Sequence, residues 1–158
     1  MPQRFLTSLT LGCLAIAVVV GSVPASAADE PSNLIKYRKA TMTAIGGHMG
    51  ALGAMAKGEV SFTDEAVLHA RAINEMSQNL LRLFPEGSGY EADKKTNALP
   101  AIWERREDFE KAVKSLQDES AKMVTVAESG DAAALGQQVS ALGRNGCSNC
   151  HDTFRYKE

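Results

Sequence analysis

The residues with the clearest chemistry lie near the C-terminus, in the run Cys147-Ser148-Asn149-Cys150-His151. Two thiols three positions apart on a helix have Cβ atoms roughly 5 to 6 Å apart and face the same way, and an imidazole follows directly. Such thiols can bond the two vinyl groups of a haem while the imidazole reaches its iron. Cys-x-x-Cys-His is the attachment signal of haem c. The motif therefore predicts one covalently attached haem c, with His151 as an axial iron ligand.

Three other kinds of site use the same residue types. A structural disulfide is allowed in an exported chain, but a bridge closing so small a loop would stabilise little. A thioredoxin-type redox pair needs a preceding strand, and none is predicted here. A zinc site needs two further ligands, whereas the remaining histidines of the mature chain, His48 and His69, fall on different predicted helices. The pattern favours haem over all three.

The elements that position this motif show helical periodicity. In the segment 33–57, residues recur at steps of three and four and share one helical face: Ile35, Arg38, Met42, Ile45, Met49, Leu52 and Ala56. Arg38 is the one charged member of this face, so it is expected to need an anionic partner. The glycines in the second half of the segment lower helix propensity, and they would let a backbone or a flat ligand come close.

Three further helices are predicted. One begins with Thr63 as N-cap and ends at Phe84 before Pro85, and a surface loop covers 85–99. Another extends from Pro100 to Gly130, and the last begins at Asp131 and includes the Cys-x-x-Cys-His motif. No segment alternates with period two over a useful length. The chain is predicted to be all-α, an antiparallel up-down-up-down four-helix bundle with haem near the end of the fourth helix.

Length and composition allow one such domain and little else. The chain has 158 residues, 44% of them hydrophobic and 23% charged, with a formal net charge of −2. These values fit one compact domain, and they argue against nucleic acid as a partner.

The N-terminus has the features of an export signal. Arg4 is the only charged residue of 1–27, an apolar stretch follows, and a small-x-small sequence ends at Ala27. The apolar stretch is short for a membrane-spanning helix. Residues 1–27 are thus predicted to be a cleaved secretory signal that also removes Cys13, leaving 28–158 as a periplasmic bundle domain without a membrane anchor.

The sequence as a whole resembles the class II c-type cytochromes, which include cytochrome c prime. The similarity spans nearly the whole mature chain, and it rests on the following short segments: Tyr37-Arg38, Ala51-Leu52-Gly53-Ala54, Lys57-Gly58-Glu59, Leu83-Phe84-Pro85, Ala101-Ile102-Trp103, and Cys147 to Arg155. A haem motif near the C-terminus is what separates this class from ordinary cytochromes c.

The resemblance implies roles for individual residues. Cys147 and Cys150 would carry the thioethers and His151 would be the proximal ligand. Arg155 would lie near that imidazole, as its position four residues after His151 on a helix also predicts. Arg38 would contact a haem propionate, with a solvent-exposed head group as the alternative. Lys39 and Asn97 match positions at the haem edge where relatives often carry glutamine and an acidic residue.

Met42 matches the position opposite the iron. It lies about 13 Å into the first helix, and His151 lies about 10 Å from the end of the last one, so the two can face each other across one haem. A thioether ligand gives six-coordinate iron and a raised potential. A methionine that only packs on the haem leaves the iron five-coordinate. The family contains both kinds, and both alternatives stay open.

These residues predict a periplasmic haem protein that carries single electrons between redox partner proteins. The alternative is a five-coordinate cytochrome that binds nitric oxide or carbon monoxide for storage, sensing or protection. An enzyme is not expected, because no acid–base cluster accompanies the motif. The resemblance implies a homodimer formed through the first two helices. Trp103 and Phe109 are assigned to the core, and His48 and His69 to the surface.

Overall fold

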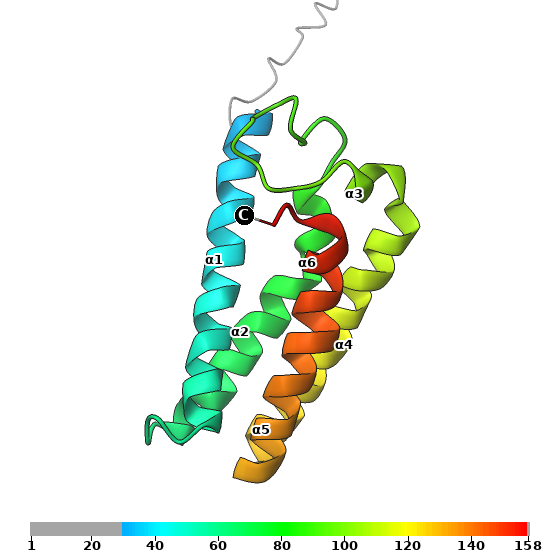
Figure 1. Ribbon diagram of the computed structural model, residues 1–158. Coiled ribbons are helices and arrows are strands. Elements are labelled where there is room, and N and C mark those ends of the chain that lie inside the picture. Colours follow the sequence, from blue (N-terminus) through cyan, green and yellow to red (C-terminus); the bar gives the residue numbers. More distant parts are fainter. Residues whose placement is uncertain (1–29, 158) are drawn as a thin grey trace, which may run out of the picture.

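The computed structural model describes residues 30–157, so the predicted signal 1–27 lies outside the described part. Four helical columns form an antiparallel bundle (Figure 1). The first three columns are α1 (Pro31–Ala56), α2 (Ala66–Gln78) and α4 (Arg106–Ser129). The fourth is nearly continuous and consists of α5 (Ala132–Ala141), the π-helical segment η4 (Leu142–Ser148) and α6 (Asn149–Phe154). The predicted four-helix bundle is confirmed, with the haem motif near the end of the fourth column.

The helix ends follow local chemistry. Pro31 occupies the first turn of α1, where its missing N–H is not needed. Gly130 ends α4 with a φ of 69°, which a residue with a side chain rarely adopts. Asp131 is the N-cap of α5, as predicted: its Oδ1 accepts hydrogen bonds from the backbone N–H groups of Ala133 and Ala134 at 2.9 and 3.0 Å.

The second predicted helix differs in detail. Thr63 begins a 3₁₀ turn, η2 (Thr63–Glu65), and its side chain caps nothing, so the N-cap prediction is wrong. The α-helical part ends at Gln78 and is followed by a second 3₁₀ turn, η3 (Leu80–Leu83), in place of a regular helix up to Phe84. This tighter end directs the chain into the long connection 85–99.

The third predicted helix is broken at Arg105, where φ is −124° and ψ is 54°. A short helix, α3 (Ala101–Glu104), precedes the break. The break allows α3 to turn away from α4, and Trp103 is half-buried against the long connection, where its Nε1–H donates to the Pro85 carbonyl at 2.9 Å. Sequence periodicity could not indicate this break, because the apolar spacing continues through it.

The core lies between the columns and is almost entirely aliphatic and aromatic. Phe109 and Met123 from α4, Ile73 from α2 and Leu52 from α1 are at most 2% exposed. The core assignment of Phe109 is thereby confirmed. Within residues 30–157, no helix is both long and apolar enough to cross a membrane.

His48 and His69 are not independent surface residues, and that prediction is wrong. Both are half-buried, and their Nδ1 atoms are 2.8 Å apart across the α1–α2 contact. Because 21 residues separate them in sequence, only the packing of α2 on α1 reveals the pair.

Candidate functional site

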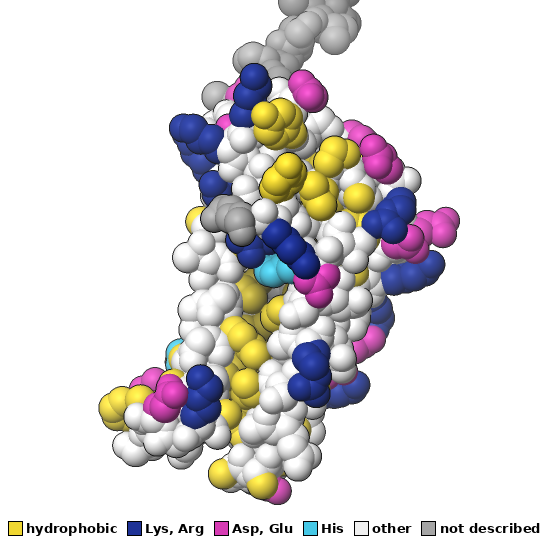
Figure 2. All heavy atoms as spheres, viewed as in Figure 1, with side chains coloured by type: hydrophobic (Ala, Val, Ile, Leu, Met, Phe, Trp, Pro, Cys, Tyr) yellow, Lys and Arg dark blue, Asp and Glu magenta, His cyan; other side chains and the backbone are white. Residues whose placement is uncertain are grey.

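A cavity of about 520 Å³ lies inside the bundle between α1, α4 and α6. Figure 2 shows its entrance as a hollow between two columns, with hydrophobic side chains in its floor and basic and histidine side chains gathered at one end. Its size is typical of a cofactor site. The apolar part of its lining includes Met42, Ile45, Met49, Leu80, Phe84, Ile102, Phe109, Val113, Leu116 and Phe154.

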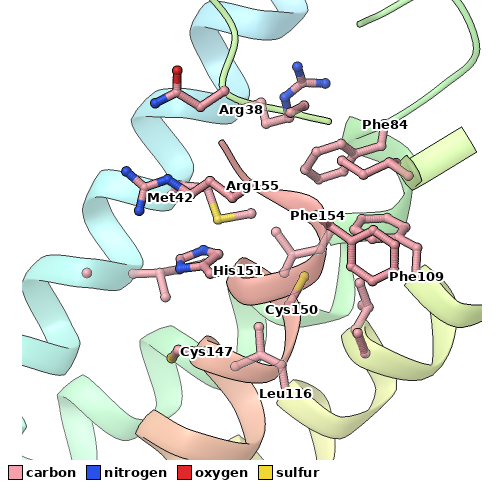
Figure 3. Close-up of a pocket in the computed structure, with 18 of the residues that line it drawn as sticks. Arg38, Met42, Phe84, Phe109, Leu116, Cys147, Cys150, His151, Phe154 and Arg155 are labelled. Carbon is pink, nitrogen blue, oxygen red and sulfur yellow. The ribbon is translucent and has the colours of Figure 1, made fainter. Parts of the chain in front are cut away.

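The motif residues meet in this cavity. Cys147, at the end of η4, and Cys150 and His151, in α6, all line it (Figure 3). The prediction that both thiols and the imidazole share one face is therefore confirmed. The π-helical turn directly before the motif is of a kind often found at functional sites.

Gly146 explains how η4 comes so close to α4. A Cβ atom at this position would lie 3.1 Å from side-chain carbons of both Leu116 and Leu142, and 3.3 Å from the Leu116 Cα. Contacts this close are tighter than ordinary van der Waals packing, so a side chain here would require Leu116 or Leu142 to shift. The glycine before Cys147 thus allows the motif to approach the cavity wall.

Burial shifts the pKa values of all three motif side chains. Burial raises the pKa of the Cys147 thiol, and burial together with Cys147 raises the pKa of Cys150 to about 11, so both remain neutral thiols near pH 7. Partial burial lowers the pKa of His151, as does Arg155, while Asp152 opposes them. The imidazole is therefore favoured in its neutral form, which can ligate a metal.

Met42 lies on the cavity wall formed by α1, and its half-buried side chain lines the same space as His151. Figure 3 shows its sulfur directed toward the cavity interior. The predicted depths of the two residues along their helices therefore agree with the structure. Whether the sulfur ligates iron depends on the bound cofactor.

Arg38 is 3% exposed, which rules out the alternative of a head group in water. Its Nη1 donates to the Leu83 carbonyl and Ser88 Oγ, and its Nη2 donates to the Ser88 carbonyl and Thr96 Oγ1, at 2.8 to 3.2 Å. The guanidinium also lies 4.5 Å from the centre of the Phe84 ring. These partners are all neutral, although an anionic one was expected.

Burial lowers the pKa of Arg38 to about 10, so the group still carries its charge near neutral pH. Arg38 also lines the cavity. The predicted contact with a haem propionate therefore stays a prediction that the position of the residue allows.

The connection 85–99 was predicted to be a surface loop, but part of it is fixed at the cavity rim. Ser88 and Thr96 are buried, and Lys39 Nζ donates to the Lys95 carbonyl at 3.2 Å. The N–H groups of Tyr156 and Leu99 donate to the carbonyls of Asn97 and Phe154 at 2.8 and 3.0 Å. Lys39 and Asn97 both line the cavity, as their predicted place at the haem edge requires.

Arg155 lies at the cavity rim with His151, although a continuous helix is not the reason. The last helix ends at Phe154, and Arg155 is extended, with φ −119° and ψ 137°. Its N–H still donates to the His151 carbonyl at 3.3 Å. The predicted proximity is correct, whereas the predicted helical register is wrong.

Three aromatic residues of the cavity were not identified as site residues from the sequence. Phe109 packs edge-on against both Phe84 and Phe154, with ring centres 4.9 and 5.3 Å apart. All three line the cavity. The segments around Phe84 and Phe154 carry the family resemblance, and that was the available signal; Phe109 has the ordinary spacing of a core residue.

The alternative sites are not formed. Cys147 and Cys150 are free thiols, and no strand precedes them in the described chain. Between residues 30 and 157, no three or more His, Cys, Asp and Glu side chains are grouped so as to hold a metal ion. Two thiols, a neutral imidazole, an apolar cavity and a basic rim instead fit a haem with its two anionic propionates. Fold and site together define a c-type haem protein built on a four-helix bundle.

Comparison with known proteins agrees. The family model for Cytochrome C' matches residues 33–155, and the chain belongs to this family of class II c-type cytochromes. It is 36% identical to cytochrome c' of Rhodospirillum rubrum over 141 residues, which cover 89% of this chain and 93% of the relative. It is 34% identical to cytochrome c-556 of Agrobacterium fabrum over 152 residues, covering 96% and 93%.

The crystal structure of cytochrome c' from Rubrivivax gelatinosus superposes with a TM-score of 0.73 at 28% identity, covering 80% of this chain and 98% of that one. The cofactor of this chain is thus covalently attached haem c. The family is one of haem proteins rather than of enzymes.

Proposed function

We propose that this protein carries single electrons, and that the haem exchanges them where the cavity opens to the surface. The observation that carries the proposal is the position of His151, which is exposed at the polar rim of a cavity whose interior is largely apolar. An apolar, rigid pocket with one exposed edge suits electron exchange, because the cofactor performs the redox chemistry and the protein supplies ligand, burial and electrostatics.

Each cavity residue would have its own role in binding the haem. Cys147 and Cys150 would hold the haem as thioethers, and His151 would ligate its iron. Arg38 and Lys39 would face its propionates from α1. Asn97 and Arg155 would complete the rim beside the imidazole. Support comes from their shared lining of one cavity and from the cationic character of its edge.

The basic rim favours anionic redox partners. Lys39 and Arg155 are both exposed there, although the chain as a whole has a net charge of −2. If the net negative charge of the chain determined how fast it meets an anionic oxidant, the two would repel each other, and added salt would speed electron exchange by screening that repulsion. If the rim governs it, added salt slows the exchange, because screening weakens a local attraction.

The test measures oxidation of the reduced holoprotein by ferricyanide, a trianion, between low and high ionic strength. We expect the second-order rate constant to fall by about three- to tenfold as salt is added. The double variant Lys39→Glu with Arg155→Glu should slow the reaction at low salt. The matched control Lys57→Glu, at the far end of α1, should affect it much less. A wild-type rate constant that rises with salt would contradict the proposal that the basic rim attracts anionic partners. The absence of any electron exchange would contradict the electron-transfer role.

Gas binding is the second candidate, and it depends on whether Met42 bonds to the iron. A thioether that packs without bonding leaves room for a diatomic ligand on that side of the haem. The two functions therefore differ in what Met42 does, and the Met42 experiment in the Discussion separates them.

Export to the periplasm belongs to the same proposal and rests on the sequence of residues 1–27. We expect the purified holoprotein to begin at or near Ala28 and to be recovered from the periplasmic fraction, because a signal of this type is removed on export. N-terminal sequencing and cell fractionation measure both. Intact residues 1–27 on cytoplasmic protein would contradict the proposal. A homodimer through α1 and α2 stays a prediction.

A further inference from the structure

The paired histidines between α1 and α2 lie outside the haem cavity and take no part in the function proposed above. His48 Nδ1 and His69 Nδ1 are 2.8 Å apart, with ring centres 5.1 Å apart and ring planes tilted by 52°. Neither residue lines the haem cavity. Two imidazole nitrogens directed at one another across a helix contact need a proton or a cation between them, because two bare lone pairs repel.

The geometry of the pair is close to that of two ligands on one metal ion. Imidazole nitrogens bind zinc at about 2.0 to 2.1 Å. Two such nitrogens at angles of roughly 90° to 110° around an ion are about 2.9 to 3.4 Å apart, from the same bond lengths. The observed 2.8 Å separation needs to open by only a few tenths of an ångström, which small side-chain rotations supply.

Glu65 gives the pair a second feature of metal sites. Its Oε2 lies 3.8 Å from His69 Nε2, the ring nitrogen that faces away from His48. Glu65 therefore places a negative charge beside the pair, which favours a cation there, although the distance is longer than a hydrogen bond.

The pair is partly accessible to solvent in the single chain. The His69 side chain is 17% exposed and that of Glu65 is 58% exposed. Since the described residues contain no cluster of three or more protein ligands, the two histidines provide two bonds and water completes the coordination. Imidazole ligands suit zinc and copper, whereas calcium and magnesium prefer oxygen.

We propose that His48 and His69 form a surface site for a divalent transition-metal ion such as Zn²⁺ or Cu²⁺, with the Glu65 carboxylate as a nearby negative charge. A bound ion would join the first two helices of the bundle, at a site separate from the haem. It would stabilise the folded protein by an amount that grows with the logarithm of the metal concentration once that concentration exceeds the dissociation constant.

The experiment uses the purified holoprotein, in which His151 is committed to the haem, and titrates it with Zn²⁺ by calorimetry. We expect one ion per chain in the wild type. His48→Gln and His69→Gln should each weaken binding at least tenfold. Glu65→Gln removes only a nearby exposed charge, so it should weaken binding less than either histidine substitution. Glu75→Gln removes an exposed carboxylate from the same helix and serves as the matched control without effect.

A second readout identifies the ligands themselves. With one equivalent of Cu²⁺, the electron paramagnetic resonance spectrum should show coupling to two imidazole nitrogens in the wild type and to one in either histidine variant. Unchanged haem absorption and circular dichroism would show that the variants are folded. Equal binding by the wild type and a folded His48→Gln/His69→Gln double variant would overturn the proposal, and so would a copper spectrum without nitrogen coupling.

Discussion

Replacing both Cys147 and Cys150 by alanine is expected to abolish covalent haem attachment completely. Both thiols line the cavity beside His151, so each is placed to form one thioether. The wild-type holoprotein, denatured and extracted with acidified acetone, should keep its haem in the protein pellet. The double variant should release any haem it has bound, or contain none. Absorbance of the organic phase measures the difference.

Single variants refine this result. Cys147→Ala and Cys150→Ala should each retain at most one thioether, which the absorption spectrum of the reduced haem in alkaline pyridine reports. Ser148→Ala lies between the two cysteines and changes neither thiol, so it should behave as wild type. Wild-type haem that extracts freely would contradict the attachment prediction.

The second large effect concerns Met42. If its sulfur ligates the iron, the oxidised protein is low-spin, and the reduced protein binds carbon monoxide slowly because a ligand must first leave. Met42→Ala should then convert the absorption spectrum to high-spin and open a vacant coordination position. This outcome favours electron transfer, since a six-coordinate iron changes its surroundings little when it gains an electron.

If Met42 only packs on the haem, the wild type is already high-spin. Met42→Ala then changes the spectrum little and speeds carbon monoxide entry, because a smaller side chain clears the cavity. Met49 lines the same cavity from α1, and Met49→Ala is the matched control for loss of a thioether elsewhere. A five-coordinate wild type that binds nitric oxide tightly and exchanges electrons slowly would favour the gas-binding function.

The residues of the motif were the most predictable part of the site. Cys147, Cys150 and His151 are joined by the short-range geometry of a helix, so local spacing sufficed to place them together. The depth of Met42 in the bundle could be predicted because the sequence indicates where its helix begins and where the helix of His151 ends. For these residues, chain position translates almost directly into depth along the bundle.

Other features depend on contacts between distant segments. The partners of Arg38 lie 45 to 58 positions away, at Leu83 and in the connection 85–99, and nothing in the local sequence there identifies them. The His48–His69 pair needs the rotation of α2 relative to α1. The break at Arg105 interrupts an apolar spacing that continues on both sides. Periodicity reports which face of a helix is buried, but it does not report what the face meets.

The attachment of the 85–99 connection has a consequence for the order of folding. Its hydrogen bonds with Arg38 and its pairing with residues 154–156 join segments about 50 to 59 positions apart. Contacts that close such long loops form late, because their entropy must be lost before they stabilise the chain. The helices should therefore associate while this end of the bundle is still open. A newly exported polypeptide would then present both thiols to haem before the rim closes over them.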